Sequence, residues 1–233
     1  MHSISILIPV LNEAENLQEL IPYLLKNSST QNIKDIIIVD GGSTDGTKNI
    51  IQHFSQVKLV QSEKGRAKQM NFGAKIAKGD ILYFLHADSF PPKDFDKDIL
   101  ERINTKTQAG CFKMSFNSSH WWLKLAGWLT RFSWKISRGG DQSLFITKSL
   151  FNALNGYNES YIIYEDNHLI HRIYNASNFA VIQKNITTSA RRYQTNGIWN
   201  LQYHFMVIHL KYRLGHPPNL LYNYYLKHIY VKK

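Results

Sequence analysis

The 233-residue sequence contains one cysteine and no long hydrophobic run. Because Cys111 has no second cysteine to pair with, an intramolecular disulfide and a cluster of thiolate metal ligands are excluded, and a reducing compartment is favoured. No apolar stretch approaches the roughly 20 residues that a membrane-spanning helix needs. The first residues lead directly into a strand-like segment without a basic start, so the sequence predicts no secretory signal and a cytoplasmic protein.

Acidic residues are scarce in the second half of the chain. Residues 1–101 contain 13 acidic and 11 basic side chains, whereas residues 102–233 contain 4 acidic and 17 basic ones. No acidic residue follows Asp166, and all five tryptophans lie after residue 101. This asymmetry indicates that the second half meets an anionic partner: a phosphate-bearing ligand, a membrane surface or a nucleic acid.

Apolar residues make up 43% and charged residues 19% of the chain, which is typical of a globular protein with one or two domains. In the first hundred residues, short β-rich runs alternate with segments of helical periodicity. The strands are expected at 4–10, 36–39, 57–60 and 81–85. The helices are expected at 13–26 with Asn12 as the cap, from Ser43 or Thr44 to about residue 54, and through residues 70 and 76. This alternation predicts an α/β fold whose Rossmann-like, mostly parallel central sheet carries helices on both faces.

Beyond residue 101 the alternation is less regular. Strands are expected at 109–116 and 144–147, and helices at 121–136 and 165–174. The aromatic-rich tail from Gly197 is expected to be helical up to a Gly-His-Pro-Pro segment that begins at Gly215, where proline ends the helix. We therefore treat 1–101 as an α/β half and 102–233 as a second half with a helical C-terminal part, both within one domain.

Polar residues and glycines follow three of the expected strands. The carboxyl ends of parallel strands meet at one edge of the sheet, where ligands of such folds bind. The three segments are Pro9-Val10-Leu11-Asn12-Glu13, Asp40-Gly41-Gly42-Ser43-Thr44-Asp45-Gly46 and His86-Ala87-Asp88. The sequence therefore predicts one binding crevice built from these segments.

Two of these segments have a structural as well as a functional interpretation. Asp40 can accept hydrogen bonds from a base or ribose and Gly42 lets a ligand approach, but an ordinary turn with Ser43 as a helix cap explains the segment about equally well. Asp88, which leaves a buried strand, can hold a divalent cation shared with a diphosphate, whereas a turn cap is the alternative. His86 is a ligand, a ribose contact or a packed core residue.

Charged residues on other segments are further candidates. Arg66 and Asn71 belong to the helix before the fourth strand, and a helix start beside Arg66 suits a phosphate. A carboxylate of Glu165-Asp166 can take the proton from an incoming hydroxyl, although acids at a helix start also favour the helix dipole. Arg191-Arg192 can grip a diphosphate or an anionic acceptor, with a surface pair as the alternative.

Seven short segments, in order between about residues 3 and 215, carry a family resemblance. They are Ile8-Pro9-Val10-Leu11-Asn12-Glu13, Val39-Asp40-Gly41-Gly42-Ser43-Thr44-Asp45-Gly46, Gly65-Arg66-Ala67-Lys68-Gln69-Met70-Asn71, Phe84-Leu85-His86-Ala87-Asp88, Gly140-Asp141-Gln142, Glu165-Asp166 and Ser189-Ala190-Arg191-Arg192-Tyr193. Together they resemble family 2 glycosyltransferases of the GT-A fold. The chain is most similar to a small bacterial branch labelled radical-SAM/selenodomain-associated.

The resemblance implies an inverting transfer of a sugar from a nucleotide-diphosphate sugar, with a UDP-sugar favoured, to an unknown acceptor. Residues 1–101 would bind the donor and residues 102–233 the acceptor. Asp166 would be the general base with Glu165 beside it, and Asp88 would bind Mg²⁺ or Mn²⁺. The donor would contact Pro9, Val10, Asn12, Glu13, Asp40, Gly42, Ser43, Arg66, Asn71, His86, Ala87, Asp88, Arg191 and Arg192.

The chain departs from the family pattern in two places. The first acid of the family's Asp-x-Asp motif is His86 here, which leaves open whether this side chain contacts the ribose or the metal. The Gln-x-x-Arg-Trp motif of processive synthases is absent, so a processive polysaccharide synthase is not expected.

Two other classes of protein remain as alternatives. A nucleotidyltransferase of related fold carries a basic, glycine-rich loop after the first strand, where this chain has Leu11-Asn12-Glu13-Ala14-Glu15. A non-enzymatic binder would use the basic half, but no nucleic-acid-binding motif is present and no nucleic acid partner is expected. The basic, aromatic segments at 121–135 and in the tail predict association with the inner face of the cell membrane, with an aromatic core under a basic solvated face as the alternative.

Overall fold

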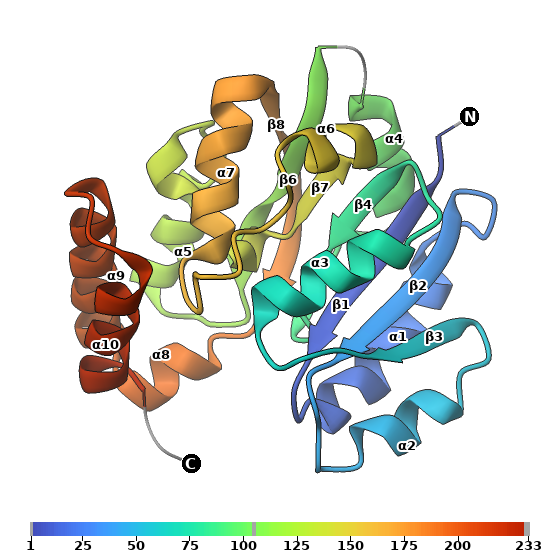
Figure 1. The fold of residues 1–233 in the computed structure, drawn as a ribbon, viewed down its shortest axis with the longest axis horizontal. Coiled ribbons are helices and arrows are strands. Elements are labelled where there is room, and N and C mark those ends of the chain that lie inside the picture. Colours follow the sequence, from blue (N-terminus) through green and yellow to red (C-terminus); the bar gives the residue numbers. More distant parts are fainter. Residues whose placement is uncertain (1, 104–105, 231–233) are drawn as a thin grey trace.

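The computed structural model describes residues 2–103 and 106–230 as an α/β fold built on one sheet (Figure 1). In these residues eight strands form the sheet in the order β3-β2-β1-β4-β7-β6-β8-β5. The strands are β1 (Ile4–Val10), β2 (Ile33–Asp40), β3 (Val57–Gln61), β4 (Ile81–Phe84), β5 (Ser89–Phe90), β6 (Thr107–Phe116), β7 (Leu144–Thr147) and β8 (Asn178–Thr188). The α-helices are α1 (Ala14–Asn27), α2 (Thr47–Gln52), α3 (Arg66–Ile76), α4 (Phe95–Arg102), α5 (Trp121–Leu129), α6 (Lys148–Ala153), α7 (Glu165–Ala176), α8 (Arg191–Asn196), α9 (Ile198–Arg213) and α10 (Pro218–His228).

Most strands of the sheet run in one direction. The pairs β1–β2, β2–β3 and β1–β4 are all parallel. Since β7 is antiparallel to both β4 and β6, and β6 is parallel to β8, the strands β6 and β8 share the direction of β1. Only β7 and the short edge strand β5 are reversed among the described strands. The mostly parallel sheet that the sequence predicts is therefore confirmed.

Helices cover both faces of the sheet, as predicted. On one face α1, α2 and α4 share a core with Ile6 and Ile8 of β1. On the other face α3, α6 and α7 pack on a second core that contains Leu7. Neighbouring residues of β1 enter different cores because successive side chains of a strand point to opposite faces.

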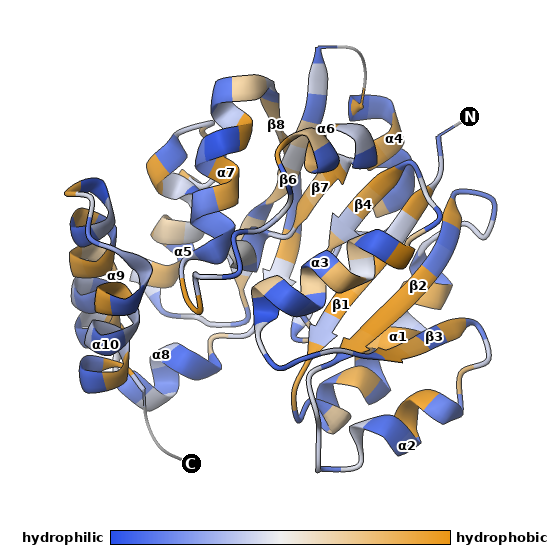
Figure 2. Cartoon of the chain, in the orientation of Figure 1, coloured by the Kyte–Doolittle hydropathy of each residue, from blue (hydrophilic) through white to orange (hydrophobic). Residues whose placement is uncertain are grey.

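The last three helices, α8, α9 and α10, lie outside the sheet at one edge of the molecule (Figure 1). Leu201 and Ile208 of α9 form a small core with Ile229, which follows α10. Figure 2 shows hydrophobic residues, in orange, on α9 and α10 as well as in the sheet. Within residues 2–103 and 106–230, no helix combines the length and the apolar character that crossing a membrane requires.

Several elements differ from the sequence prediction. The helix expected at 121–136 is shorter and ends at Leu129. The Thr130 hydroxyl donates to the carbonyl of Gly127 (2.6 Å), and a separate 3₁₀ turn follows at Lys135–Ser137. The proline segment that ends α9 also starts a further helix, α10, in which Pro218 occupies the first position, where its missing N–H is not needed. Neither β8 nor α4 is predicted from the sequence; β8 is half-exposed and lacks a clear alternation.

Candidate functional site

The loop between β1 and α1 interlocks with the segment between β2 and α2 at the carboxyl edge of the sheet. The backbone N–H of Asn12 donates to the hydroxyl of Ser43 (2.9 Å), and that of Glu13 donates to the hydroxyl of Thr47 (3.1 Å). The N–H that opens α1 donates to the carboxylate of Asp45 (3.1 Å). Side chains of one loop thus accept hydrogen bonds from the free N–H groups of the other. These bonds hold the two loops together at the edge of the sheet where the sequence predicts a binding crevice.

The helix caps predicted at Asn12 and at Ser43 or Thr44 are wrong. Asn12 has a left-handed backbone with φ of 59°, and its side-chain oxygen accepts from the N–H of Thr44 (2.8 Å). Helix α2 starts only after Gly46, whose φ of 88° suits glycine. These polar side chains bond across the two loops instead of along their own chain, and sequence spacing alone does not reveal such bonds.

Asp40 is fully buried at the end of β2. One oxygen, Oδ1, accepts from the backbone N–H of Ser43 (2.9 Å) and from its hydroxyl (2.5 Å). The other, Oδ2, lies 3.7 Å from Nζ of Lys48. Asp40 therefore shapes the Ser43 turn in this structure, and its contact with a nucleotide base stays a prediction.

Gln69 of α3 is a site residue that reasoning from the sequence missed. Its buried Nε2 donates to the carbonyls of Val10 (2.8 Å) and Val39 (2.7 Å), so it joins the ends of β1 and β2. A Cβ on Gly41 would lie 3.1 Å from the Gln69 amide, so glycine favours this close approach. A glutamine on the apolar side of a helix is the only signal that the sequence offered for this role.

Five titratable side chains converge where α3 and α7 begin, beside the end of β4. Nη1 of Arg66 lies 3.1 Å from Oε1 of Glu165 and 3.6 Å from Oδ2 of Asp166. Nε2 of His86 lies 4.0 Å from the same Asp166 oxygen, and its Nδ1 lies 3.5 Å from Oδ1 of Asp141. The structure thus brings together residues from four separate segments of the sequence.

Burial and charge shift the pKa values in this cluster. Burial raises the pKa of Glu165 to about 7; the positive charge of Arg66 opposes this rise and the negative charge of Asp166 adds to it. The Arg66 side chain is only partly buried; this partial burial disfavours its charged form, yet the carboxylates of Glu165 and Asp166 raise its pKa above the ordinary value. Arg66 therefore stays positively charged at any pH at which the protein works.

The histidine of the cluster is also shifted. Burial disfavours protonated His86, but the hydrogen bond to Asp141 and the charge of Asp166 outweigh burial and raise its pKa. The hydrogen bond and the positive charge of His86 hold the pKa of the Asp141 carboxyl below its usual value. The pairing of His86 with Asp141 therefore favours the protonated imidazole and the ionised Asp141 carboxylate.

Asn71 and Tyr157 connect α3 to the segment that leads into α7. The amide of Asn71 donates to the Tyr157 carbonyl (2.9 Å) and to Oε1 of Glu159 (2.8 Å), and its oxygen accepts the N–H of Tyr157 (2.9 Å). The Tyr157 ring is buried, and burial together with the charges of Asp166 and Glu165 raises the pKa of its phenol. Asn71, which the sequence places at the donor, is engaged in holding this segment; its donor contact stays a prediction.

Asp88 follows β4 at the same edge of the sheet and is half-buried. Among the described residues no group of three or more His, Cys, Asp or Glu side chains forms a ready-made metal site. Mg²⁺ and Mn²⁺ prefer oxygen ligands, and Mg²⁺ is commonly held by one or two carboxylates while substrate phosphates and waters complete its shell. The Asp88 carboxylate fits this mode of binding, whereas His86 is engaged with Asp141 and Asp166.

The residues that flank these groups form the floor of the site. Val10 and Ala87 are almost fully buried in the core beneath α1, and Pro9 is half-buried. Gly42 has a φ of 99°, which favours glycine. Val10 and Ala87 therefore have packing roles in this structure, and donor contacts at all four residues stay predictions.

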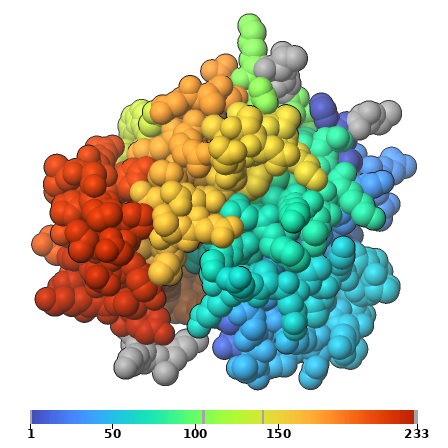
Figure 3. All heavy atoms as spheres, in the orientation of Figure 1, coloured from blue at the N-terminus to red at the C-terminus, as the bar shows by residue number. Residues whose placement is uncertain are grey.

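The two arginines of α8 bring the C-terminal part of the chain to the same region. Nη2 of Arg191 lies 3.7 Å from Oε1 of Glu13 in the β1–α1 loop. Arg192 donates to the phenol of Tyr225 in α10 (2.6 Å) and lies over its ring. Figure 3 shows the surface hollowed between the cyan segment at the start of α3 and the red C-terminal helices.

Comparison with known proteins identifies the family. A family model described as "Glycosyl transferase family 2" matches residues 5–174. The chain belongs to glycosyl transferase family 2. This finding confirms the resemblance drawn from the sequence motifs.

Curated glycosyltransferases match parts of the chain. Glycosyltransferase AglE of Haloferax volcanii is 33% identical over 94 residues, which are 38% of this chain and 31% of AglE. Dolichol-phosphate mannosyltransferase of Pyrococcus furiosus is 32% identical over 106 residues, 43% of this chain and 30% of that protein. The matched region thus spans about a third of the length of these relatives.

Solved structures show the same fold. TarS of S. aureus in complex with UDP-GlcNAc has a TM-score of 0.67 at 19% identity, covering 80% of this chain and 58% of TarS. Mannosyltransferase PcManGT from Pyrobaculum calidifontis, in complex with GDP-Man and Mn²⁺, has a TM-score of 0.70 at 16% identity, covering 97% of this chain and 70% of that protein. The GT-A fold expected from the motifs is therefore confirmed.

Proposed function

We propose that this protein transfers a sugar from a nucleoside diphosphate sugar to an acceptor hydroxyl, with inversion at the anomeric carbon and with a divalent metal ion. The observation that carries the proposal is the convergence of the buried Glu165–Asp166 pair on Arg66 and His86, at the sheet edge where Asp88 follows β4. Family membership supports sugar transfer. The UDP-GlcNAc complex of one structural neighbour, and the GDP-Man and Mn²⁺ of another, support a nucleotide-sugar donor and a metal.

Asp166 is the general base of the proposed reaction. A general base accepts the proton of the attacking hydroxyl, and the Asp166 carboxylate lies at the start of α7, 3.6 Å from Nη1 of Arg66. Glu165 is the more deeply buried acid and makes the closer contact with Arg66, at 3.1 Å. Glu165 therefore orients Arg66, while Asp166 accepts the proton.

The donor side of the site consists of Asp88, Arg66 and the interlocked loops. Asp88 would hold Mg²⁺ or Mn²⁺, which, when bound, neutralises the charge on the departing diphosphate. Arg66 is 43% exposed, so its guanidinium can meet a phosphate while it contacts the two acids. The hydrogen-bonded loops around Asn12 and Ser43 would position the nucleoside. Holding the reacting groups themselves in the right geometry can lower a barrier by roughly 7–11 kcal/mol.

The acceptor of the proposed reaction is lipid-linked or anionic and is met at the cytoplasmic face of the cell membrane, without a nucleic acid partner. The basic residues after position 101 support an anionic acceptor. The names of two relatives each include a phosphate-bearing acceptor. They are the dolichol-phosphate mannosyltransferase of Pyrococcus furiosus and the poly(ribitol-phosphate) β-N-acetylglucosaminyltransferase TarS of Staphylococcus aureus. The single cysteine agrees with a reducing compartment.

The β1–α1 loop disfavours a nucleotidyltransferase. Such an enzyme grips a triphosphate with basic and glycine residues directly after the first strand. Here the loop contains Glu13, α1 carries Glu15 in its first turn, and the backbone N–H groups of the loop are already occupied by Ser43 and Thr47. A diphosphate sugar held through Asp88 and Arg66 therefore agrees better with the site.

Two substitutions test the proposal by separating donor binding from chemistry. Asp166→Asn should keep the rise in melting temperature that a bound donor causes, but should slow UDP or GDP release from the donor by about 10²–10⁴-fold. Asp88→Ala should abolish the part of the melting-temperature rise that depends on Mn²⁺ or Mg²⁺. Asp94→Asn, at an exposed aspartate before α4, is the matched control and should leave both readouts unchanged.

A donor that fails to raise the melting temperature of the wild-type protein with either metal would refute the proposed substrate class. If instead Asp166→Asn releases nucleotide at the wild-type rate, Asp166 is not the base. UDP-GlcNAc and GDP-Man are the first donors to compare, because structural neighbours bind them.

A further inference from the structure

Helix α9 has apolar residues on two opposite faces. Its inner face packs Leu201 and Ile208 into the small core shared with α10. Its outer face presents an apolar stripe that follows the helical spacing i, i+4, i+7, i+11 and i+15. The members of this α9 stripe, each between 56% and 69% exposed, are Trp199, Tyr203, Met206, Leu210 and Leu214. At 1.5 Å per residue the stripe is about 22 Å long.

Helix α5 carries a second exposed stripe. Trp121, Leu125 and Trp128 follow the spacing i, i+4 and i+7 and are between 39% and 61% exposed. The stripe continues beyond the helix through Phe132, whose ring centroid lies 5.5 Å from that of Trp128, and Trp134, which stacks on Phe132 at 4.7 Å. Helix α5 therefore also presents a row of large apolar side chains to the outside.

The two stripes meet. The ring centroid of Trp199, at the start of α9, lies 6.1 Å from that of Trp121 and 5.1 Å from that of Trp122. We call the two stripes and their flanking cations, Lys124, Arg131 and Arg213, the basic aromatic face. Isolated exposed apolar residues are common on proteins, but a continuous patch of this kind marks an interaction surface.

The basic aromatic face carries positive charge without nearby negative charge in the sequence. Lys124, Arg131 and Arg213 are exposed beside the stripes, and Arg131 also lies over the Trp128 ring. The sequence has no acidic residue between Glu101 and Asp141 and none after Asp166, so neither α5 nor α9 contains an acid. The partner of this face must therefore supply the negative charge.

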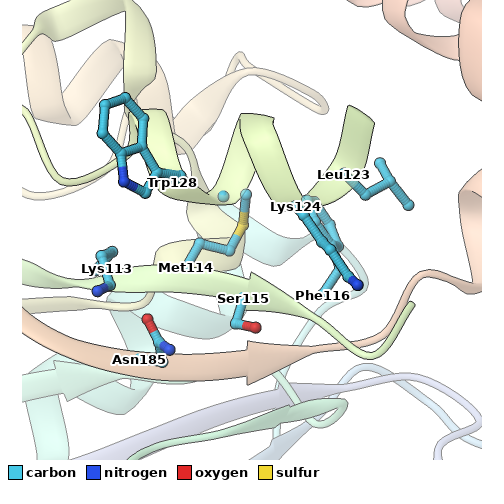
Figure 4. A pocket seen from close by; sticks show the side chains of 9 residues that line it. Lys113, Met114, Ser115, Phe116, Leu123, Lys124, Trp128 and Asn185 are labelled. Carbon is cyan, nitrogen blue, oxygen red and sulfur yellow. The ribbon is translucent and has the colours of Figure 1, made fainter. Parts of the chain in front are cut away.

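A groove beneath α5 adjoins this face. It has a volume of about 200 Å³ and lies between α5 and the strands β6 and β8. Figure 4 shows Lys113, Ser115 and Asn185 on the strands, and Lys124 and Trp128 on the helix, around it. Two lysines, a hydroxyl and an amide suit a small anionic group such as a lipid phosphate.

A second copy of the chain fits this face poorly. In a two-fold symmetric dimer the same patch meets itself, so Lys124, Arg131 and Arg213 would approach their own copies. Like charges that meet without an intervening acid destabilise the contact. A surface of anionic lipid offers the opposite charge together with an apolar layer beneath it.

We infer that the basic aromatic face docks onto the surface of an anionic lipid bilayer. This inference depends on the proposed function in one respect only, which is that the acceptor is linked to a lipid. Trp and Tyr prefer the level of the lipid headgroups. An apolar helix face flanked by cations lies in the plane of that interface. Helices α5 and α9 provide both features, side by side at Trp121 and Trp199.

The docking surface is connected to the catalytic acids. The phenol of Tyr164, which directly precedes Glu165, hydrogen-bonds to Nδ1 of His209 in α9 (2.5 Å). His168 of α7 bonds in the same way to the phenol of Tyr212 (3.1 Å). A membrane that holds α9 therefore also holds the start of α7 at a fixed distance from the lipid surface.

Flotation of the full chain with vesicles tests the inference. At about 0.15 M NaCl the protein should float with vesicles of phosphatidylcholine containing about one-third phosphatidylglycerol, and it should stay behind with phosphatidylcholine alone. A Met206→Ser/Leu210→Ser variant and a Lys124→Gln/Arg131→Gln/Arg213→Gln variant should each lose binding. For the three cations the partition constant should fall by about a hundredfold, since each contributes about fivefold.

Control variants carry changes of the same kind at exposed positions of the α/β half. Phe72→Ser on α3 removes an exposed apolar residue, and Lys34→Gln/Lys58→Gln/Lys75→Gln removes three exposed lysines of the α/β half. Both controls should float like the wild type. The donor-induced rise in melting temperature should be unchanged in all the variants, because none touches the donor site.

Four results would overturn the inference. In the first, the wild-type protein does not float with anionic vesicles; in the second, it binds equally well to vesicles of phosphatidylcholine alone. In the third, the stripe variants float as well as the wild type. In the fourth, light scattering shows a dimer that the Met206→Ser/Leu210→Ser change dissociates. Absence of flotation with normal donor binding rejects the docking surface alone. Absence of donor binding with normal flotation rejects only the proposed function.

Discussion

Replacing Glu165 by glutamine should stabilise the protein at alkaline pH. Glu165 is 1% exposed, and burial raises the pKa of its carboxyl from an ordinary 4.5 to about 7. Between these two values the folded protein keeps the proton and the unfolded chain releases it. The free energy of unfolding therefore falls as the pH rises through this window.

The size of the effect follows from the two pKa values. The difference between 4.5 and about 7 corresponds to about 3 kcal/mol of stability that the wild type has lost once the pH exceeds 7. Glutamine has nearly the same shape and cannot ionise, so Glu165→Gln avoids this loss. At about pH 5, where wild-type Glu165 is protonated in the folded state, the two proteins should be nearly equal in stability.

Thermal or urea unfolding at about pH 5 and about pH 8.5 measures the difference between variant and wild type. For a chain of this length, about 3 kcal/mol raises the melting temperature by roughly 6–12 °C at the higher pH. Glu19→Gln, at an exposed position on α1, is the control and should behave like the wild type at both pH values. A Glu165→Gln variant that is destabilised equally at both pH values would show that Arg66 already compensates the buried charge fully.

Two further substitutions test the packing that holds the site. Gln69→Leu removes the hydrogen bonds to the carbonyls of Val10 and Val39 and should lower the free energy of unfolding in urea by about 2–3 kcal/mol. Gln52→Leu, at an exposed position of α2, is the control and should change it little. Gly110→Ala would place a Cβ 2.4 Å from the carbonyl oxygen of Ala180, between β6 and β8, and should lower stability by about 3 kcal/mol, with a corresponding fall in melting temperature. Gly139→Ala, which has nothing within 4 Å of its Cβ, should leave stability unchanged; equal effects at both glycines would contradict the close approach of the strands.

The sequence predicted those strands and helices whose own apolar residues recur at regular strand or helix spacing. The strand at Ile4–Val10 has the predicted bounds, and α1 buries Leu17, Leu20, Ile21 and Leu24 at helical spacing. Glu165 and Asp166 lie at the start of a helix, as expected. The scarcity of acids in that half is what singled them out as candidates.

Features that depend on contacts between distant segments were not predictable from the sequence. The loop around Asn12 takes its hydrogen bonds from Ser43 and Asp45, some 30 residues away, so the expected local caps do not form. The buried bonds of Gln69 join two strands that precede it. β8 is stabilised by pairing with β6 and not by an alternation of its own residues.

The continuous sheet limits how the protein can move during turnover. β4 pairs with β7 over four residues, Ile81 to Phe84 against Thr147 to Leu144, and the short β5 pairs with β8. Two ladders of hydrogen bonds therefore join residues 1–101 to residues 102–233. A hinge between two lobes needs a flexible connection that absorbs large backbone changes, and a paired strand in the middle of a sheet does not provide one. Backbone movement is therefore expected in the segments outside the sheet, with the sheet acting as a rigid base.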